Sequence, residues 1–171
     1  MLSFFMYEPK TFTFEIPIRP KAVQSTRFNG RYSSVDPKVK KWKEQLASFI
    51  RFKKPEIPSK MPFEVVEAIY TFKLPQSISK KAMKKIQEAW DKGEDVAYIS
   101  TPDLSDNINK GVADVLTAEG VWEDDKRLWR VAEDAVIKKV YGLHDSIKIT
   151  IRETPGVLLS NGKTALEEFG V

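Results

Sequence analysis

Cysteine is absent from the 171-residue sequence, and histidine occurs once, at His144. Without cysteine the chain has no disulfide scaffold, no thiolate zinc site and no cysteine nucleophile, and its composition fits a reducing compartment. A single histidine also gives little support to zinc-dependent hydrolysis or to a Ser-His-Asp triad. We therefore expect a structural role for His144, which lies in the segment YGLHDS, interpreted as a hairpin loop.

Long apolar runs and phosphate-binding glycine motifs are also missing. No stretch approaches the roughly 20 apolar residues that a membrane-spanning helix needs. The N-terminal MLSFFMYEPK has no basic region, and its apolar run is too short for a signal peptide. Neither G-x-G-x-x-G nor a P-loop occurs, so nothing indicates a nucleotide cofactor. The sequence predicts a cytoplasmic protein without a membrane partner.

Charge is abundant in the sequence and unevenly distributed. The chain has 28 Lys and Arg against 24 Asp and Glu, a formal net charge of +4. Residues 101–125 contain seven acids and one base, a local charge of −6, whereas residues 19–54 contain eleven bases and two acids, a local charge of +9. A basic surface suggests a polyanionic partner, although it also fits a solvated face.

The hydrophobic pattern predicts one α+β domain with a mixed β-sheet and about three helices. The length suffices for a single core, and nothing divides the chain. We therefore expect one domain over residues 1–171, with a core at about 11–153 and a tail at 154–171 that ends in a short helix. Alternating or apolar segments predict strands at residues 11–18, 62–73, 96–100, 128–140 and 146–153.

Capping signals place the three helices. Asp36 followed by Pro37 is a good helix start, and the helix that follows has a basic outer face. Ser79 can cap a second helix, and a third helix is expected to end at Gly120. Pro17 cannot donate to a sheet ladder, which favours an edge position for the first strand or a strand end at this residue.

The segment TPDLSDNINK, residues 101–110, concentrates acids just before the third helix. Asp103 or Ser105 can cap that helix. Asp106, Lys110 and Asp114 are spaced by four residues, so on a helix they share one face. The segment therefore predicts carboxylates and an ammonium group that lie close together.

A second acidic run, EDD at residues 123–125, follows a turn that contains Trp122, which is expected to be buried and to anchor the turn. This turn can bring the acids near the start or the end of the third helix. Clustered carboxylates cannot all stay ionised without a cation, and hard oxygen ligands select Mg²⁺ or Mn²⁺. A nearby lysine can neutralise charge that develops on a phosphate. The same acids also fit a helix cap and a solvated loop.

The order of these motifs resembles the RusA-type Holliday junction resolvases of bacteria and their phages. The chain has PD-L-S-DN-I-x-K, an apolar helix and V-W-x-DD, which is similar to the family's D-L-D-N-L-x-K followed by G-x-W-x-D-D. FTFEIPIRPKAVQSTRFNGRYSS and SIKITIRE extend the similarity to about residues 11–153. The resemblance implies a homodimeric, Mg²⁺-dependent endonuclease, with Mn²⁺ as an alternative ion, that places paired nicks in four-way DNA junctions during recombination, repair or replication.

The resemblance also implies the site residues. Asp106, Asn107 and Lys110 match D-N-x-x-K, and Asp125 matches the second aspartate of the D-D pair. Asp103 matches the family's first aspartate, but D-L-S-D has one residue more than D-L-D. Because residues three apart do not share a face of a strand, this aspartate converges with the next only through a bulge or in a helix. The implied metal ligands are Asp103, Asp106 and Asp125 with Asp124 as an auxiliary, and the implied catalytic set is Asp103, Asp106, Lys110 and Asp125.

Basic side chains are the expected DNA contacts. They come from the loop after the first strand, from the first two helices and from the pair that follows the EDD run. The residues expected to bind DNA are Arg19, Lys21, Arg27, Arg31, Lys38, Lys41, Lys126 and Arg127, with Lys80, Lys81, Lys84 and Lys85 on the second helix.

Two other functions fit the same residues. One is a non-catalytic DNA-binding or replication accessory protein, in which the acids only cap a helix and face solvent. The other is a nuclease of broader specificity for branched DNA. Mg²⁺-dependent nicking of junctions separates the first from a resolvase, and a comparison of junction with linear DNA at one salt concentration separates the second.

Overall fold

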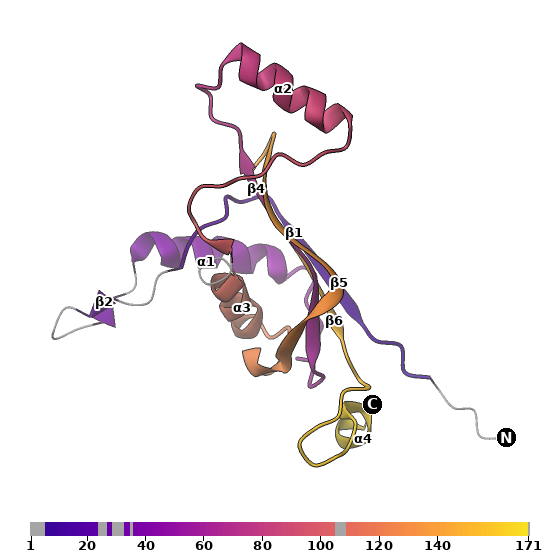
Figure 1. The fold of residues 1–171 in the computed structure, drawn as a ribbon. Helices are drawn as coiled ribbons and strands as arrows, with labels where there is room; N and C mark the ends of the chain where they lie inside the picture. Colours follow the sequence, from indigo (N-terminus) through magenta and orange to yellow (C-terminus); the bar gives the residue numbers. More distant parts are fainter. Residues whose placement is uncertain (1–5, 24–26, 29–32, 35, 105–108, 171) are drawn as a thin grey trace.

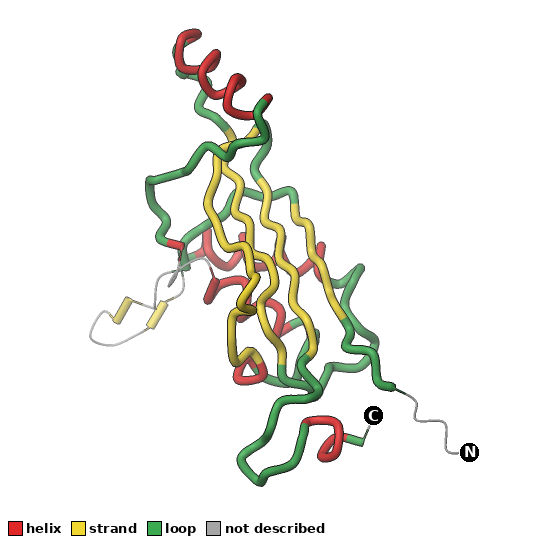
Figure 2. The backbone as a smooth tube through the Cα atoms, turned by 45° about the vertical axis from the view of Figure 1, so that its right-hand side comes forward, coloured by secondary structure: helices red, strands yellow, loops and turns green. Residues whose placement is uncertain are grey.

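A computed structural model of the chain describes residues 6–23, 27–28, 33–34, 36–104 and 109–170. Within these residues, four strands form one mixed sheet, and helices α1 and α3 cover one of its faces (Figures 1 and 2). The α+β fold with a mixed sheet is thus confirmed. The strands are β1 (Thr11–Ile16), β4 (Phe63–Lys73), β5 (Leu128–Gly142) and β6 (Ser146–Glu153), with a small hairpin of β2 (Arg27–Phe28) and β3 (Ser33–Ser34). The helices are α1 (Pro37–Ile50), α2 (Lys80–Asp91), α3 (Asn109–Ala118) and α4 (Ala165–Phe169), with a 3₁₀ turn η2 (Asp125–Arg127).

The sheet has the strand order β1-β6-β4-β5. Strand β6 runs antiparallel to both β1 and β4, whereas β5 runs parallel to β4. The predicted edge position of β1 is confirmed. The alternation of SIKITIRE is also confirmed, because Ile147, Ile149 and Ile151 are buried on the helix-covered face.

Helix α1 begins as its sequence predicts. The Asp36 carboxylate accepts a hydrogen bond from the Lys38 backbone N–H at 2.8 Å, and Pro37 is the first helical residue. One face of the helix is buried in the core, and Trp42 on that face donates its indole N–H to the Arg19 carbonyl at 2.9 Å. That bond attaches the loop after β1 to α1. The buried residues of this face are Val39, Trp42, Leu46, Ala47 and Ile50.

The strand predicted at residues 96–100 is wrong in extent, because only one bridge forms, between Ala97 and Val140 of β5. Beyond Tyr98 the backbone carbonyls bond to side chains instead of a neighbouring strand. The side chains of Tyr98 and Lys139 therefore satisfy backbone carbonyl groups that a longer strand would have paired with its neighbour.

The hairpin expected at YGLHDS is also wrong. Strands β5 and β6 are consecutive in sequence, but β4 lies between them in the sheet. Both pair with β4 nearly to its end, through Lys73 with Gly142 and Thr71 with Ser146. Because these backbone groups bond to β4, the connection that holds His144 crosses the end of a third strand. The side chain of His144 is exposed.

A buried glutamate organises the sheet face opposite the helices. Glu64 of β4 is only 3% exposed, and its carboxylate accepts hydrogen bonds from Arg130 Nε at 2.7 Å and Arg152 Nε at 2.8 Å. Burial alone would raise the pKa of Glu64, but hydrogen bonds and charge attraction from Arg152 and Arg130 outweigh it and lower the pKa. The ionised carboxylate therefore ties three strands together.

We expect Glu64→Gln to lower the free energy of unfolding by about 2 kcal/mol at pH 7, because hydrogen bonds to charged groups are lost in a buried place. The folded-state pKa of Glu64 lies below its unfolded value, so its contribution is present above the unfolded pKa and is lost as pH falls through the folded pKa. Urea unfolding of both proteins should therefore show a difference in the free energy of unfolding at pH 7, and this difference should disappear in acid. An equal stability at pH 7 would contradict this role.

Candidate active site

The residues just before the acidic segment lie beside β5, where Ala97 forms a bridge with Val140. Asp103 is exposed, and the next residue, Leu104, packs against the core. Asp106 and Asn107, the centre of the predicted motif, lie outside the described residues. Whether Asp103 and Asp106 converge therefore stays a prediction.

Two side chains that the sequence analysis did not single out hold the segment before Asp103. The Lys139 ammonium group on β5 donates to the carbonyls of Ser100 and Pro102, both at 2.8 Å. The Tyr98 hydroxyl donates to the Thr101 carbonyl at 2.9 Å. The Tyr98 ring stacks on the buried Phe72 ring, with centroids 3.8 Å apart and planes 7° from parallel. The side chains of Lys139 and Tyr98 thus hold three consecutive backbone carbonyl groups just before Asp103. These carbonyls belong to Ser100, Thr101 and Pro102.

Lys139→Met is expected to reduce the turnover number by about 10- to 100-fold, because a shift of about 1 Å in a catalytic group has an effect of this size. DNA affinity should change little. Lys138→Met is the matched control, since its ammonium group pairs with Asp95 at 2.5 Å and contacts none of these carbonyls. Cleavage kinetics test the prediction, and Lys139→Arg should restore part of the rate. A loss confined to the KM for DNA would show that Lys139 does not position the segment.

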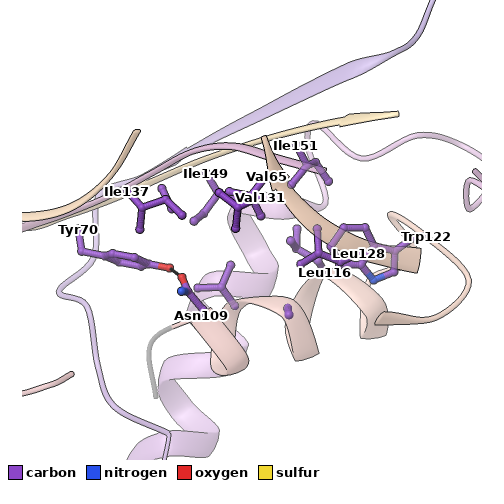
Figure 3. A pocket seen from close by; sticks show the side chains of 13 residues that line it. Val65, Tyr70, Asn109, Leu116, Trp122, Leu128, Val131, Ile137, Ile149 and Ile151 are labelled. Carbon is purple, nitrogen blue, oxygen red and sulfur yellow. Dashed lines mark hydrogen bonds between the residues drawn. The ribbon is translucent and has the colours of Figure 1, made fainter. Parts of the chain in front are cut away.

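Helix α3 carries Lys110, which is exposed in the first turn. Beside it, the Asn109 side-chain oxygen accepts a hydrogen bond from the hydroxyl of Tyr70, which is buried in β4 (Figure 3). One turn later, Asp114 accepts from the Lys43 ammonium group of α1 at 2.9 Å. The sheet and α1 therefore fix the helix that presents the lysine.

The cavity drawn in Figure 3 lies between α3 and the sheet and has a volume of about 150 Å³. Apart from the Tyr70 and Asn109 pair, its walls are mostly aliphatic and aromatic side chains, among them Val65, Ile149 and Trp122. Walls of this kind offer few polar groups to a phosphate or a metal ion. The cavity therefore lacks the donors that a metal or phosphate site needs.

The turn after α3 confirms the predicted anchor. Trp122 is 1% exposed, its ring lies 5.3 Å from that of Phe63, and its indole N–H donates to the Thr117 hydroxyl at 2.7 Å. Gly120 has a φ of +76°, a conformation that glycine adopts without strain. The Val121 N–H donates to the Leu116 carbonyl at 3.0 Å. The chain thus folds back, and η2 contacts α3.

The fold-back brings carboxylates together. A hydrogen bond with Asp124 raises the pKa of Asp125, as do some loss of hydration and the negative charges of Asp124 and Asp114. The pKa of Asp124 is lowered, chiefly by the Lys126 backbone N–H, which it accepts at 2.9 Å. The charge of Asp114 on α3 thus acts on Asp125, and Lys110 lies one turn before Asp114 on the same helix.

The chemistry of these donors fits a divalent cation. Asp103, Asp124 and Asp125 offer hard oxygen atoms, and the crowding that raises the pKa of Asp125 is the condition that a cation relieves. Over the described part of the chain, no three histidine or acidic side chains are grouped closely enough to hold a metal ion. Asp106, the predicted central ligand, lies outside that part.

The bases predicted to bind DNA differ in their surroundings. Arg19 pairs with Asp145 at 3.2 Å and lies over the Phe72 ring. Arg127 pairs with Glu123 at 3.3 Å and lies over the Phe169 ring. These two guanidinium groups already have contacts inside the protein. Lys38, Lys41 and Lys126 are exposed and Lys21 is half-buried, whereas Arg31 and the side chain of Arg27 lie outside the described residues.

A basic protein with one α+β domain, which places aspartates beside a helix that presents a lysine, has the features of an enzyme that cleaves nucleic acid. Comparison with known families agrees. The family described as Endodeoxyribonuclease RusA matches residues 17–152. The chain belongs to the RusA family. No curated protein matches the sequence.

Family membership confirms the resemblance seen in the sequence and decides for an enzyme over an accessory protein. The chain is an endodeoxyribonuclease, a hydrolase that acts on DNA junctions. The family implies resolution of Holliday junctions, a branched DNA substrate and a general dependence on divalent metal, and it occurs in bacteria and phages. Among the helices described, none has the length and apolar character needed to cross a membrane.

Proposed function

We propose that this endonuclease resolves four-way DNA junctions with paired nicks and that it depends on Mg²⁺, with Mn²⁺ as a substitute. Asp103, Asp106 and Asp125 would hold the ion, with Asp124 as an auxiliary ligand. The observation that supports this most is the fold-back that places Asp125 against Asp124 and near Asp114 on the lysine-bearing helix. The proposal also assigns the whole of residues 1–171 to one domain of a cytoplasmic protein.

The ion would supply charge neutralisation at the phosphate and a lower pKa for an attacking water. The chain's own residues do the rest. The carboxylates on η2 and before α3 would hold the cation. The exposed ammonium group of Lys110 donates a hydrogen bond to a phosphate oxygen, where negative charge grows as the P–O bond breaks. The protein thus stabilises the transition state more than the bound DNA.

A homodimer accounts for paired nicks, because two equivalent sites related by a two-fold axis match two opposed strands. The edge strand β5 offers a surface for a second copy. Trp129, Val131 and Val136 on this strand are 46%, 52% and 43% exposed. Among the described strands, β5 pairs with β4 alone, apart from the bridge between Ala97 and Val140 near its far end, and exposed apolar edges are sites that another chain covers.

The proposal is tested with a mobile four-way junction labelled on each strand. We expect paired, symmetric nicks with Mg²⁺, none with EDTA, and little cleavage of linear duplex of the same sequence at the same salt concentration. Equal cleavage of junction, fork, flap and linear DNA would instead show a nuclease of broader specificity. Cleavage at an unchanged rate in EDTA would contradict the metal requirement.

A further inference from the structure

Helix α2 stands apart from the body of the protein. It lies beyond the end of the sheet, on the side opposite α4, and well away from α1 and α3 (Figures 1 and 2). None of its residues is fully buried. Its start is well defined, since the Ser79 hydroxyl accepts from the Ala82 N–H at 3.1 Å. The chain therefore builds a complete helix that contributes little to the core.

The two faces of α2 differ in character. The apolar residues are half-buried, and the lysines of the opposite face are exposed. At 100° per residue, the lysines occupy one side of the helix and the apolar residues the other. The apolar side chains are Ala82, Met83, Ile86, Ala89 and Trp90, and the lysines are Lys80, Lys81, Lys84 and Lys85.

The lysines of α2 have no acidic partner among the described residues, unlike many bases of the body. Lys43, Arg51 and Lys148, for example, pair with acids at 2.7 to 2.9 Å. Two of these lysines, Lys80 and Lys81, also fall in the first turn of the helix, where the helix dipole is positive and cations are disfavoured. The helix thus concentrates unpaired positive charge at a place where it lowers helix stability, and a polyanionic partner would offset that cost.

The form of this surface suits a phosphate backbone. The charges lie on the exposed side of the helix and their apolar neighbours lie on the opposite side, so recognition depends on point charges without a side-chain pocket. Lys85, the last of these lysines, is followed by six residues of helix and then by twelve residues up to Asp103, a span of about 50 Å at most. One turn of duplex is about 34 Å long. A duplex arm that leaves the cleavage site can therefore reach α2.

We propose that α2 is a second DNA-binding surface, which holds the backbone of a duplex arm about one helical turn from the cut. This inference rests on the proposed function for the location of the cut. It deepens that function, because it makes affinity depend on arm length. A junction with long arms contacts both α2 and the active site, whereas a junction with short arms contacts the active site alone.

The test measures binding in EDTA, by fluorescence anisotropy, to junctions with arms of about 8 and about 20 base pairs, which are roughly 27 and 68 Å long. The variant is K81Q/K84Q/K85Q, since glutamine keeps helix propensity close to that of lysine. The control is K10Q/K60Q/K163Q, which removes the same charge from exposed lysines of the body. Circular dichroism verifies that both variants are folded.

We expect the α2 variant to bind long-arm junctions at least about tenfold more weakly, with a salt dependence reduced by about two to three phosphate contacts. Its affinity for short-arm junctions should match that of the control. Equal losses for the two variants, or equal losses at both arm lengths, would overturn the proposal, and so would unchanged DNA binding. Binding is measured without metal, so the role of α2 can be judged even in a protein that does not cleave junctions. Absence of junction cleavage would refute the proposed function alone.

Discussion

Asp125→Asn is expected to reduce junction cleavage by about 10³-fold or more, while the protein stays folded. Loss of a charged metal ligand removes several kcal/mol of transition-state stabilisation, and each 1.36 kcal/mol corresponds to a factor of ten. The fold should not suffer. Asp125 is exposed and crowded by Asp124 and Asp114, so a neutral side chain removes repulsion. We therefore expect a melting temperature equal to or slightly above that of the unchanged protein.

Single-turnover cleavage of a labelled junction measures the effect. Glu94→Gln is the control, because it removes one negative charge from an exposed side chain outside the site. Asp106→Asn should behave as Asp125→Asn does if both residues share the ion. A folded Asp125→Asn protein that cuts at a normal rate would remove this residue from the metal site. A melting temperature several degrees lower would show instead that the carboxylate has a structural role.

Lys110→Met is expected to reduce the cleavage rate at saturating DNA by about 10²- to 10³-fold, the usual effect of removing one donor to a developing charge. Methionine keeps the helix propensity and the length of the side chain. Lys110 is exposed, and the first turn of α3 is held by the bond between Tyr70 and Asn109. The helix should therefore keep its position. Unlike Asp125→Asn, this variant should bind metal normally.

A multiple-turnover assay of the same junction, with DNA in excess, separates rate from affinity for the lysine variant. Lys60→Met is the control for loss of one exposed ammonium group. Lys110→Arg should recover part of the rate, because arginine keeps the charge with a different shape. A variant that cleaves normally once DNA is saturating would mean that Lys110 only binds the substrate.

Those elements whose signals are local in sequence were predictable. Asp36 and Ser79 cap α1 and α2 through their own neighbours, so their types alone identify the helix starts. The alternation of β6 depends on one buried face, and the turn at Trp122 on one large apolar side chain. In each case the residues that carry the signal are the ones that make the contact.

The contacts that position the site were not predictable, because they join residues far apart in sequence. Lys139 bonds to carbonyls 37 and 39 residues away, and Tyr70 bonds to Asn109 across 39 residues. Nothing near Lys139 in the sequence distinguishes it from other strand lysines. The hairpin expected at His144 failed for a similar reason, because β4 pairs with both strands beside it. Local pattern identifies the strands, whereas their order is decided by long-range pairing.

The candidate site was also predictable only in part. The sequence supplies the chemical groups, and the structure adds that the carboxylate of Asp125 is acted on by the charges of Asp124 and of Asp114 on α3. It also adds that Arg19 and Arg127 are held by Asp145 and Glu123. The convergence of Asp103 with Asp106 depends on residues 105–108, outside the described part, and stays a prediction.

The central claim is that oxygen atoms from the two acidic segments hold one divalent cation next to an ammonium group. Electron paramagnetic resonance of Mn²⁺, titrated into the unchanged protein and into the D106N/D125N variant without DNA, tests it most directly. We predict that the unchanged protein binds Mn²⁺ and that the folded double variant loses at least tenfold in affinity. Identical titration curves for the two proteins would contradict the claim.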